Sequence, residues 1–231
     1  MQSHCEQAPF TRRDLFRMAA MGCAVLGGTA STLSVARRTQ AQTTLSPDEA
    51  LKTLMDGNAR FRSGQLTSFQ EDLTLLAQKT AEKQEPFAAV LSCADSRVPV
   101  EIVFDQTIGH VFVVRVAGNV ATPEIIASLE YGAAVLGTRL LMVLGHSACG
   151  AVTAAIAGKG VPGQISALYA PLRPAVDQAG PNPDATIRVN ARLQASLLGK
   201  ASPVLAEMAA AGKLRVVSAH YDIASGEVTL L

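Results

Sequence analysis

The stretch FAAVLSCADSR, residues 87–97, joins a predicted strand to a dense group of reactive side chains. Its first part, residues 87–92, is almost entirely apolar, which is typical of a strand that is covered on both faces. Its second part places Cys93, Asp95 and Arg97 within five residues. A hydrophobic strand that ends in a thiol, a carboxylate and a guanidinium indicates a functional site at its carboxyl end.

Two more apolar strands are predicted further along the chain, and each is followed by a helix. One strand covers residues 111–116 and leads to a helix over residues 122–136. The other covers residues 140–144 and leads to a helix that begins near Cys149. Strands of this kind, alternating with helices, are typical of a parallel sheet with helices on both faces. We therefore expect an α/β fold with a central, mainly parallel β-sheet flanked by helices.

The two ends of the domain are predicted to add an N-terminal helical arm and a C-terminal hairpin. Residues 46–49, Ser-Pro-Asp-Glu, form a capping box that begins a helix ending at Gly64. Strands over residues 214–220 and 228–231 are separated by a turn and read as a hairpin at the sheet edge. Further helices are expected over residues 73–83, 99–104, 185–198 and 203–211, with one more inside the Gly- and Pro-rich connection 158–184.

The beginning of the chain has the composition of a targeting segment. Residues 11–17, TRRDLFR, resemble the motif of a twin-arginine export signal, and residues 18–35 are uncharged but too rich in small residues for a membrane span. Residues 39–41 suit cleavage after the third of them. We therefore predict a signal peptide over residues 1–41. Residues 42–231 would form a single domain, periplasmic or otherwise exported, that meets a membrane only during export.

Other interpretations of the leader stay open, and the composition limits the partners. The leader would also suit an amphipathic arm or a retained anchor, and Cys23 faintly resembles a lipoprotein site. The formal net charge of the chain is +1, which gives no basis for a nucleic-acid partner. Loss of the leader would leave Cys93 and Cys149 as the only cysteines.

These cysteines belong to a set of residues that suits a metal ion. Cys93, His146 and Cys149 follow the ends of two predicted strands, and the carboxyl ends of parallel strands meet at one edge of a sheet. Two thiolates and an imidazole are good ligands for zinc. Three protein ligands leave one coordination position open, which is the arrangement of a catalytic rather than a structural zinc site.

Simpler interpretations compete with the metal site. Cys93 and Cys149 would also suit one disulfide. His146 would suit a cap of the turn before the next helix, with Cys149 as a small core residue. Asp95 and Arg97 would suit an exposed ion pair of little energetic weight. None of these alternatives explains why all five residues follow strand ends.

At this point the sequence resembles a known family. The motifs CADSRV (93–98) and GHSACGAV (145–152) are similar to those of the β-class carbonic anhydrases, as are FVVRVAGN (112–119) and SLEYG (128–132). The resemblance extends from about residue 50 to the C-terminus. It implies a zinc-dependent enzyme that converts carbon dioxide and water reversibly to bicarbonate and a proton. It also implies one Zn²⁺ per chain and a homodimer or tetramer.

The resemblance assigns roles to individual residues. The zinc ligands implied are Cys93, His146 and Cys149. Asp95 and Arg97 would form the catalytic dyad, and Asp95 would also be a conditional fourth ligand in a closed state favoured at lower pH. Activity is therefore expected to rise toward alkaline pH. Gly118 and Gln106 are assigned to the substrate pocket.

Other functions remain compatible with the same residues. An enzyme of this fold would also suit another small linear substrate, such as carbon disulfide, because the zinc ligands would be the same. A zinc-stabilised, catalytically silent interaction protein is a second alternative, although a structural zinc site needs neither Asp95 nor Arg97. A dithiol redox protein is a third, but the separation of the two cysteines and the nearby His146 disfavour it.

Overall fold

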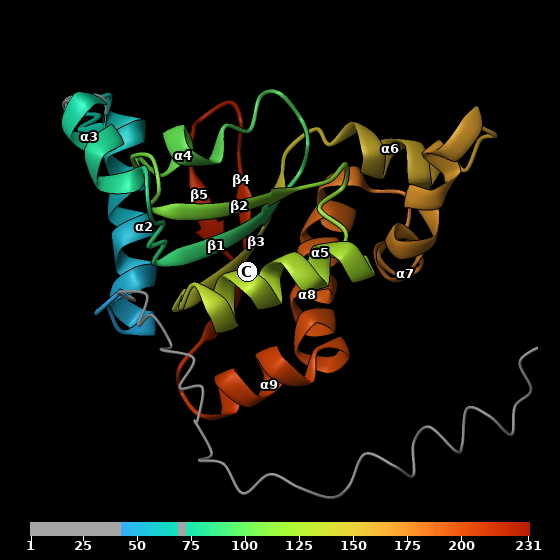
Figure 1. Cartoon of the computed structure of the whole chain (residues 1–231). Helices are drawn as coiled ribbons and strands as arrows, with labels where there is room; N and C mark the ends of the chain where they lie inside the picture. The colour runs from blue at the N-terminus through green and yellow to red at the C-terminus, as the bar shows by residue number, and fades with distance from the viewer. Residues whose placement is uncertain (1–42, 69–72) are drawn as a thin grey trace, which may run out of the picture. The chain divides into compact units, whose positions relative to one another are not determined.

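The computed structural model describes residues 43–68 and 73–231, so the predicted signal peptide lies outside the described residues. The described strands form one sheet in the order β2-β1-β3-β4-β5 (Figure 1). They are β1 (Ala88–Ser92), β2 (Val111–Arg115), β3 (Leu140–His146), β4 (Arg215–Tyr221) and β5 (Val228–Leu230). The first four are parallel, and β5 runs antiparallel to β4 as the predicted hairpin requires. The predicted α/β fold with a mainly parallel sheet is confirmed.

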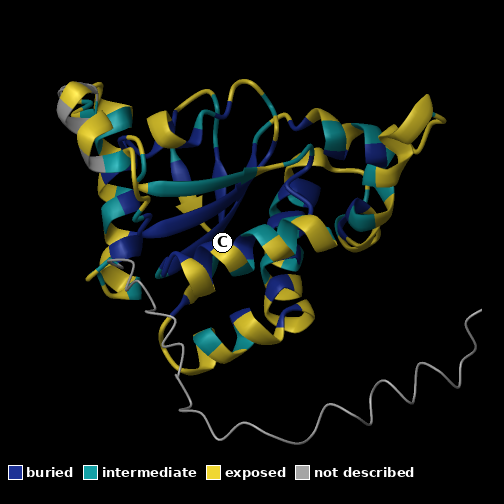
Figure 2. Cartoon of the chain, in the orientation of Figure 1, coloured by how far each residue is buried: buried dark blue, intermediate teal, exposed yellow. Residues whose placement is uncertain are grey.

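Helices cover both faces of this sheet. Successive residues of a strand point to opposite faces, and the buried strands carry apolar side chains on both, so each face needs a cover. Ala88 and Val90 of β1 pack with one group of helices, and Ala89 and Leu91 pack with the other. The first group is α2 (Pro47–Ser63) and α4 (Val100–Val103). The second is α5 (Pro123–Glu130), η2 (Tyr131–Val135), α8 (Pro183–Ala201) and α9 (Pro203–Ala210). Figure 2 shows the central strands as the most deeply buried part of the domain.

The N-terminal arm is formed mainly by α2, and its ends match the sequence signals. The Ser46 side chain accepts a hydrogen bond from the Glu49 N–H, and the Glu49 carboxylate accepts one from the Ser46 N–H. Gly64 ends the helix in the left-handed conformation, with a φ of 70°. The buried side of α2 packs on the sheet beside α4, and α3 (Leu73–Thr80) follows it along the chain.

Most predicted helix and strand bounds differ from the structure by a few residues, such as the helix predicted over 73–83, which ends at Thr80. Three differences are larger or concern the site. Strand β3 is two residues longer than predicted because Gly145 and His146 still pair with β4. The predicted helix 122–136 changes to a π-helix at η2. The connection 158–184 contains two helical segments rather than one, η3 (Gly163–Leu168) and α7 (Tyr169–Ala179), after α6 (Gly150–Ala157). Burial of apolar side chains stabilises α7 by more than the low helix propensity of the Gly- and Pro-rich segment destabilises it.

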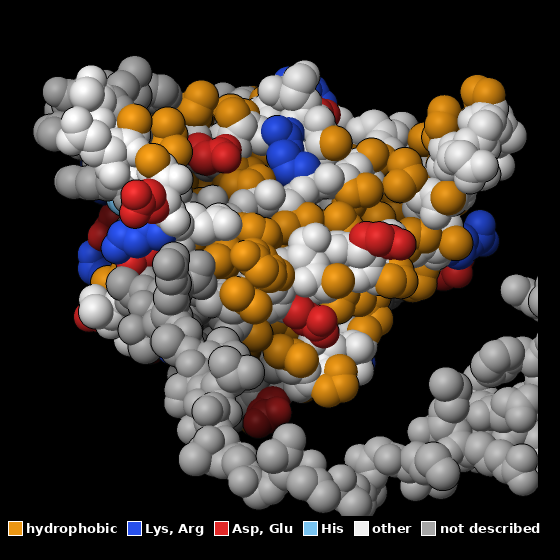
Figure 3. All heavy atoms as spheres, viewed as in Figure 1, with side chains coloured by type: hydrophobic (Ala, Val, Ile, Leu, Met, Phe, Trp, Pro, Cys, Tyr) orange, Lys and Arg blue, Asp and Glu red, His pale blue; other side chains and the backbone are white. Residues whose placement is uncertain are grey.

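One face of the domain is rich in exposed hydrophobic side chains. Strand β2 is an edge strand of the sheet, bonded only to β1 within the described part of the chain. Tyr131, which is 45% exposed, contacts Phe112 of β2. Val135 follows it in η2 and is also 45% exposed, and Ile108, three positions before β2, is 61% exposed. Figure 3 shows hydrophobic side chains gathered over β2 and the α5–η2 segment. Within residues 43–68 and 73–231, no helix combines the length and hydrophobicity that a membrane span needs.

Candidate active site

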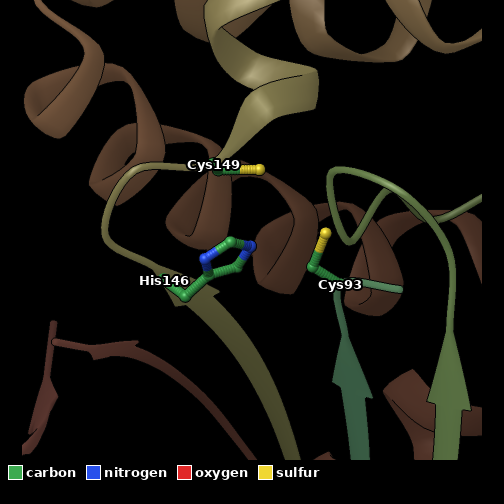
Figure 4. Close-up of side chains that lie close together, drawn as sticks. All are labelled: Cys93, His146 and Cys149. Atoms are coloured by element: carbon green, nitrogen blue, oxygen red, sulfur yellow. The ribbon is translucent and has the colours of Figure 1, made fainter. Parts of the chain in front are cut away.

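Three buried side chains from separate elements meet at the carboxyl edge of the sheet. Cys93 directly follows β1, His146 is the last residue of β3, and Cys149 is the N-cap residue of α6. Their sulfur and ring-nitrogen atoms all lie within 4.8 Å of one another. Figure 4 shows the three side chains pointing toward a common space. The predicted convergence is confirmed, and both cysteines are free thiols rather than a disulfide.

The His146 ring is oriented for coordination. Its Nδ1 lies 2.9 Å from the carbonyl oxygen of Ser147, so an Nδ1–H donates there. Its Nε2 is buried and has no hydrogen-bond partner, which is unusual for a polar atom in a protein interior. A neutral imidazole with its proton on Nδ1 presents the Nε2 lone pair, the form that binds a metal.

The two thiols influence each other strongly. A hydrogen bond from Cys149 lowers the pKa of the Cys93 thiol, burial opposes this shift, and contacts with His146 and the Gly118 N–H add to it. The same contact with Cys93, together with burial, raises the pKa of Cys149. The two sulfurs therefore interact directly, and a divalent cation would compete with a proton for them. Two thiolates and an available imidazole nitrogen fit zinc.

Asp95 and Arg97 form a bidentate ion pair next to this group. The Nε of Arg97 donates to Oδ1 of Asp95 at 2.9 Å, and its Nη2 donates to Oδ2 at 2.7 Å. The backbone N–H of Arg97 also donates to Oδ1, at 2.9 Å. The hydrogen bonds from the Arg97 side chain hold the pKa of Asp95 well below its usual range. Asp95 is therefore a carboxylate at neutral pH.

The position of this pair sets it apart from an ordinary exposed ion pair. Oδ2 of Asp95 lies 3.9 Å from Nε2 of His146, and the Asp95 side chain is only 17% exposed. Arg97 also donates to the carbonyl oxygen of Ala148, at 3.1 Å, between the two ligands of the second motif. The carboxylate thus faces the atom that would bind the metal.

Arg115 at the end of β2 also supports the site, a role that the sequence did not reveal. Its Nε donates to the carbonyl oxygen of Cys93 at 2.9 Å, and its Nη2 donates to that of Asp95 at 2.6 Å. The parallel register of β1 and β2, which pairs Ser92 with Arg115, brings the guanidinium to this loop. Arg115 belongs to the motif FVVRVAGN (112–119), which resembles the β-class carbonic anhydrases, but nothing in that motif indicated which groups the side chain binds.

The two residues assigned to the substrate pocket lie in different places. The N–H of Gly118 donates to the sulfur of Cys93 at 3.3 Å, so Gly118 is part of the site. The side chain of Gln106 instead donates to the carbonyl oxygen of Phe104 at 2.8 Å and lines a hollow with Phe87 and His110. The hydrogen bonds described for Gln106 do not reach the three metal-binding side chains. The assignment of both residues to a substrate pocket stays a prediction.

Comparisons with known proteins agree with this geometry. Residues 88–228 match the family model described as carbonic anhydrase. Carbonic anhydrase 2 of Mycobacterium tuberculosis is 35% identical over 196 residues, covering 80% of this chain and 93% of the relative. The carbonic anhydrase of Mycolicibacterium smegmatis is 36% identical over 193 residues, with the same coverage.

Solved structures share the fold. The β-carbonic anhydrase CafA of Aspergillus fumigatus superposes with a TM-score of 0.63 at 25% identity, covering 80% of this chain and 89% of that one. A tetrameric β-carbonic anhydrase of Sordaria macrospora has a TM-score of 0.60 at 24% identity, covering 69% and 90%.

The sheet and the site together define a zinc enzyme of the α/β class. The extent of the family match and the identity with its relatives place it more closely: the chain belongs to the β-carbonic anhydrase family. Members of this family are zinc-dependent lyases, and the group formed by Cys93, His146 and Cys149 supplies the ligand types that zinc requires.

Proposed function

We propose that this chain catalyses the reversible hydration of carbon dioxide to bicarbonate and a proton, and that it does so outside the cytoplasm. The observation that carries the reaction is the position of Asp95. Its Oδ2 lies 3.9 Å from Nε2 of His146 while Arg97 holds the carboxylate in place. A zinc site that only stabilises the fold needs no such pair.

The chain would hold one zinc ion through Cys93, His146 and Cys149. When bound, zinc supplies a Lewis-acid centre and makes a water molecule more acidic, an effect for which carbonic anhydrases are the standard example. The Nδ1–H of His146 donates to the Ser147 carbonyl oxygen and fixes the ring for this purpose. The burial of all three ligands limits competition from bulk water.

Asp95 orients the water that is consumed in the reaction. An ionised carboxylate only accepts hydrogen bonds, so Oδ2 would accept one from this water and turn an oxygen lone pair toward carbon dioxide. The new bond forms between that oxygen and the carbon atom, and a proton is released to buffer. Because Arg97 lowers the pKa of Asp95, the carboxylate is a weak base, and its role is orientation rather than proton storage.

Arg97 would determine whether Asp95 orients the substrate water or binds the metal itself. The distance of 3.9 Å between Oδ2 and Nε2 of His146 is short enough for the carboxylate to reach the same metal ion after a small shift. The two side-chain hydrogen bonds from Arg97 oppose that shift because they engage both carboxylate oxygens. We propose that Arg97 keeps Asp95 available for the substrate water and that its release gives the closed state.

The proposed location depends on residues 1–41. The Arg12-Arg13 pair, the uncharged segment after it and the small residues before position 42 support export through the twin-arginine pathway. Replacement of both arginines by lysine should retain the protein in the cytoplasm, as measured by fractionation of cells. Unchanged export of that variant would contradict this route.

The proposed assembly is a homodimer formed through the β2 edge. The unpaired edge of β2 and the exposed side chains Ile108, Tyr131 and Val135 support this surface, since patches of this kind usually mark interaction sites. The tetrameric relative from Sordaria macrospora is consistent with assembly in this family. A second copy of the chain is the occupant that we propose.

The reaction is tested by stopped-flow measurement of carbon dioxide hydration, with the zinc content of the same sample determined. We expect about one zinc per chain and a rate that depends on buffer concentration. Zinc at full occupancy without hydration would overturn the proposed reaction and favour the silent interaction protein.

A further inference from the structure

A tight turn after β2 lies beside the first metal ligand. Its four residues, 116–119, are closed by a hydrogen bond of 2.9 Å from the N–H of Asn119 to the carbonyl oxygen of Val116. Gly118, the third residue, has a φ of 78°, the value of a type II turn. This form directs the N–H of Gly118 at the sulfur of Cys93, at 3.3 Å.

The hydrogen bond to the sulfur depends on the form of this turn. In a type I turn the third residue has a φ near −90°, so the peptide group before it is rotated. That rotation would direct the N–H of Gly118 away from Cys93. Whatever holds residues 116–121 in place therefore determines whether the sulfur keeps its donor.

Two buried side chains of α8 hold the far side of this turn. Nδ2 of Asn190 donates to the carbonyl oxygen of Gly118 at 2.9 Å. Oε1 of Gln194 accepts from the N–H of Ala121 at 2.9 Å, and its Nε2 donates to Oδ1 of Asn190 at 3.1 Å. Gln194 also donates to the carbonyl oxygen of Pro171 in α7, at 3.2 Å. Asn190 and Gln194 are 1% and 3% exposed, so bulk water has little access to these bonds.

The same helix lies against the strand that carries the second ligand. A Cβ atom at Gly145 would lie 3.1 Å from Cγ2 of Ile187 and 3.5 Å from Cβ of Ala191, so α8 approaches β3 closely there. Gly145 directly precedes His146. Helix α8 therefore contacts the supports of two ligands, through packing at β3 and through hydrogen bonds at the turn.

We propose that Asn190 and Gln194 are positioning residues of the metal centre, which hold the turn so that Gly118 donates to the sulfur of Cys93. This inference rests on the proposed zinc site. An N–H donor stabilises the lone pairs of a thiolate and reduces the charge that it gives to a metal. Because two thiolates already balance the charge of a dication, a donor on one of them keeps the metal more electrophilic.

A purely structural role is the competing explanation. Buried amides such as Asn190 and Gln194 commonly satisfy backbone groups without any effect on a distant site. Such a role would affect the stability of the fold but not the electronic state of Cys93. The test therefore needs a signal that comes from the sulfur itself.

The experiment compares cobalt-substituted full-length chains carrying Asn190→Leu or Gln194→Met with the wild type. Loss of the N–H donor should move the sulfur-to-cobalt charge-transfer bands to lower energy, because the thiolate electrons are then less stabilised. Zinc affinity, measured by competition with a chelator, should fall by about 10–100-fold, because the loosened turn no longer holds Cys93 in its coordinating position.

Thr186→Val is the matched control. The hydroxyl of Thr186 is buried and donates to the carbonyl oxygens of Gly180 and Asn182, one turn before Asn190 on the same helix. This variant should lose stability, seen as a lower melting temperature, and keep the wild-type absorption bands. A band shift of equal size in the control would overturn the proposal.

Unshifted bands in the two test variants would also overturn it. If Asn190→Leu does not fold, the absorption bands of Gln194→Met alone test the proposal. That variant removes the bond to Ala121 and leaves the carbonyl oxygen of Gly118 its donor from Asn190. Failure of the wild type to bind cobalt would overturn the zinc site and this inference together. Cobalt binding with the expected shifts but without carbon dioxide hydration would support the inference and overturn only the proposed reaction.

Discussion

Arg97 binds both carboxylate oxygens of Asp95, with donor–acceptor distances of 2.9 and 2.7 Å. The two residues are separated by one position in the chain, and the backbone N–H of Arg97 adds a third contact. The pair fixes a charged carboxylate 3.9 Å from Nε2 of His146. The loop after β1 thus presents a metal ligand and an oriented acceptor together.

Replacement of Arg97 by methionine should lower the hydration rate by about 100-fold or more, because the carboxylate is no longer held in its productive position. If Arg97 acts through Asp95, the double variant Asp95→Asn/Arg97→Met should be no slower than Arg97→Met alone. Stopped-flow rates of Arg97→Met, of Asp95→Asn and of the double variant test this. Independent, multiplicative losses would contradict the proposed coupling.

Replacement of Arg115 by methionine should lower the hydration rate by about 10–100-fold, as is usual when an outer support of a metal site is lost. Arg115→Lys is the informative control, because lysine keeps the charge but cannot span the carbonyl oxygens of Cys93 and Asp95. Both variants should therefore be impaired to a similar extent. A lysine variant with the wild-type rate would show that the charge alone matters.

Asp105 should make the stability of the protein sensitive to acid. Its side chain is fully buried and accepts hydrogen bonds from Arg60 at 2.5 Å and from the N–H groups of Thr67 and Ser68 at 2.9 Å. Burial alone would raise its pKa, but these contacts outweigh burial and place the pKa well below the ordinary value. The carboxyl group of Asp105 then binds a proton more tightly in the unfolded chain than in the folded one. Its contribution to the free energy of unfolding is therefore complete above about pH 4 and is lost as the pH drops further.

Urea unfolding of Asp105→Asn at several pH values tests this expectation. The variant should be less stable by about 2–3 kcal/mol at neutral pH, the usual size for hydrogen bonds to a charged group. Its stability should also depend less on pH below 4 than that of the wild type. Asp177→Asn, which breaks only an exposed pair with Arg173, should change stability little. Parallel pH curves for Asp105→Asn and the wild type would exclude this role.

Removal of zinc with a chelator should lower the melting temperature, since a ligand that binds only the folded state stabilises it. The stabilisation amounts to about 4 kcal/mol when free zinc exceeds its dissociation constant a thousandfold. Loss of the ion would leave Nε2 of His146 buried without a partner. Addition of zinc should restore the melting temperature of the wild type but not of Cys149→Ser. Equal melting temperatures with and without zinc would count against a metal held in the core.

Ile108→Glu should weaken the proposed homodimer, because it places a charge on the exposed hydrophobic face beside β2. Ile165→Glu in η3 alters a side chain of comparable exposure, 47%, away from that edge strand. Light scattering over a range of concentrations should detect monomers only for the first variant. A homodimer that persists in both variants, or that dissociates equally in both, would contradict an interface at the β2 edge.

The three metal-binding residues were predictable because their signals are local. His146 and Cys149 lie three positions apart across the end of one apolar strand, and Cys93 directly follows another. The alternation of such strands with helices already requires a parallel sheet whose carboxyl ends meet. The sequence by itself therefore determined the fold class and which side chains converge.

Only the tertiary structure decided what supports those side chains. Arg115 reaches the carbonyl oxygen of Cys93 across 22 positions, and Asn190 reaches that of Gly118 across 72. Every residue carries a backbone carbonyl, so no residue type in the sequence marks these acceptors. The pairing follows from the register between β1 and β2 and from the close approach of α8 to β3, and both arise when the layers pack together.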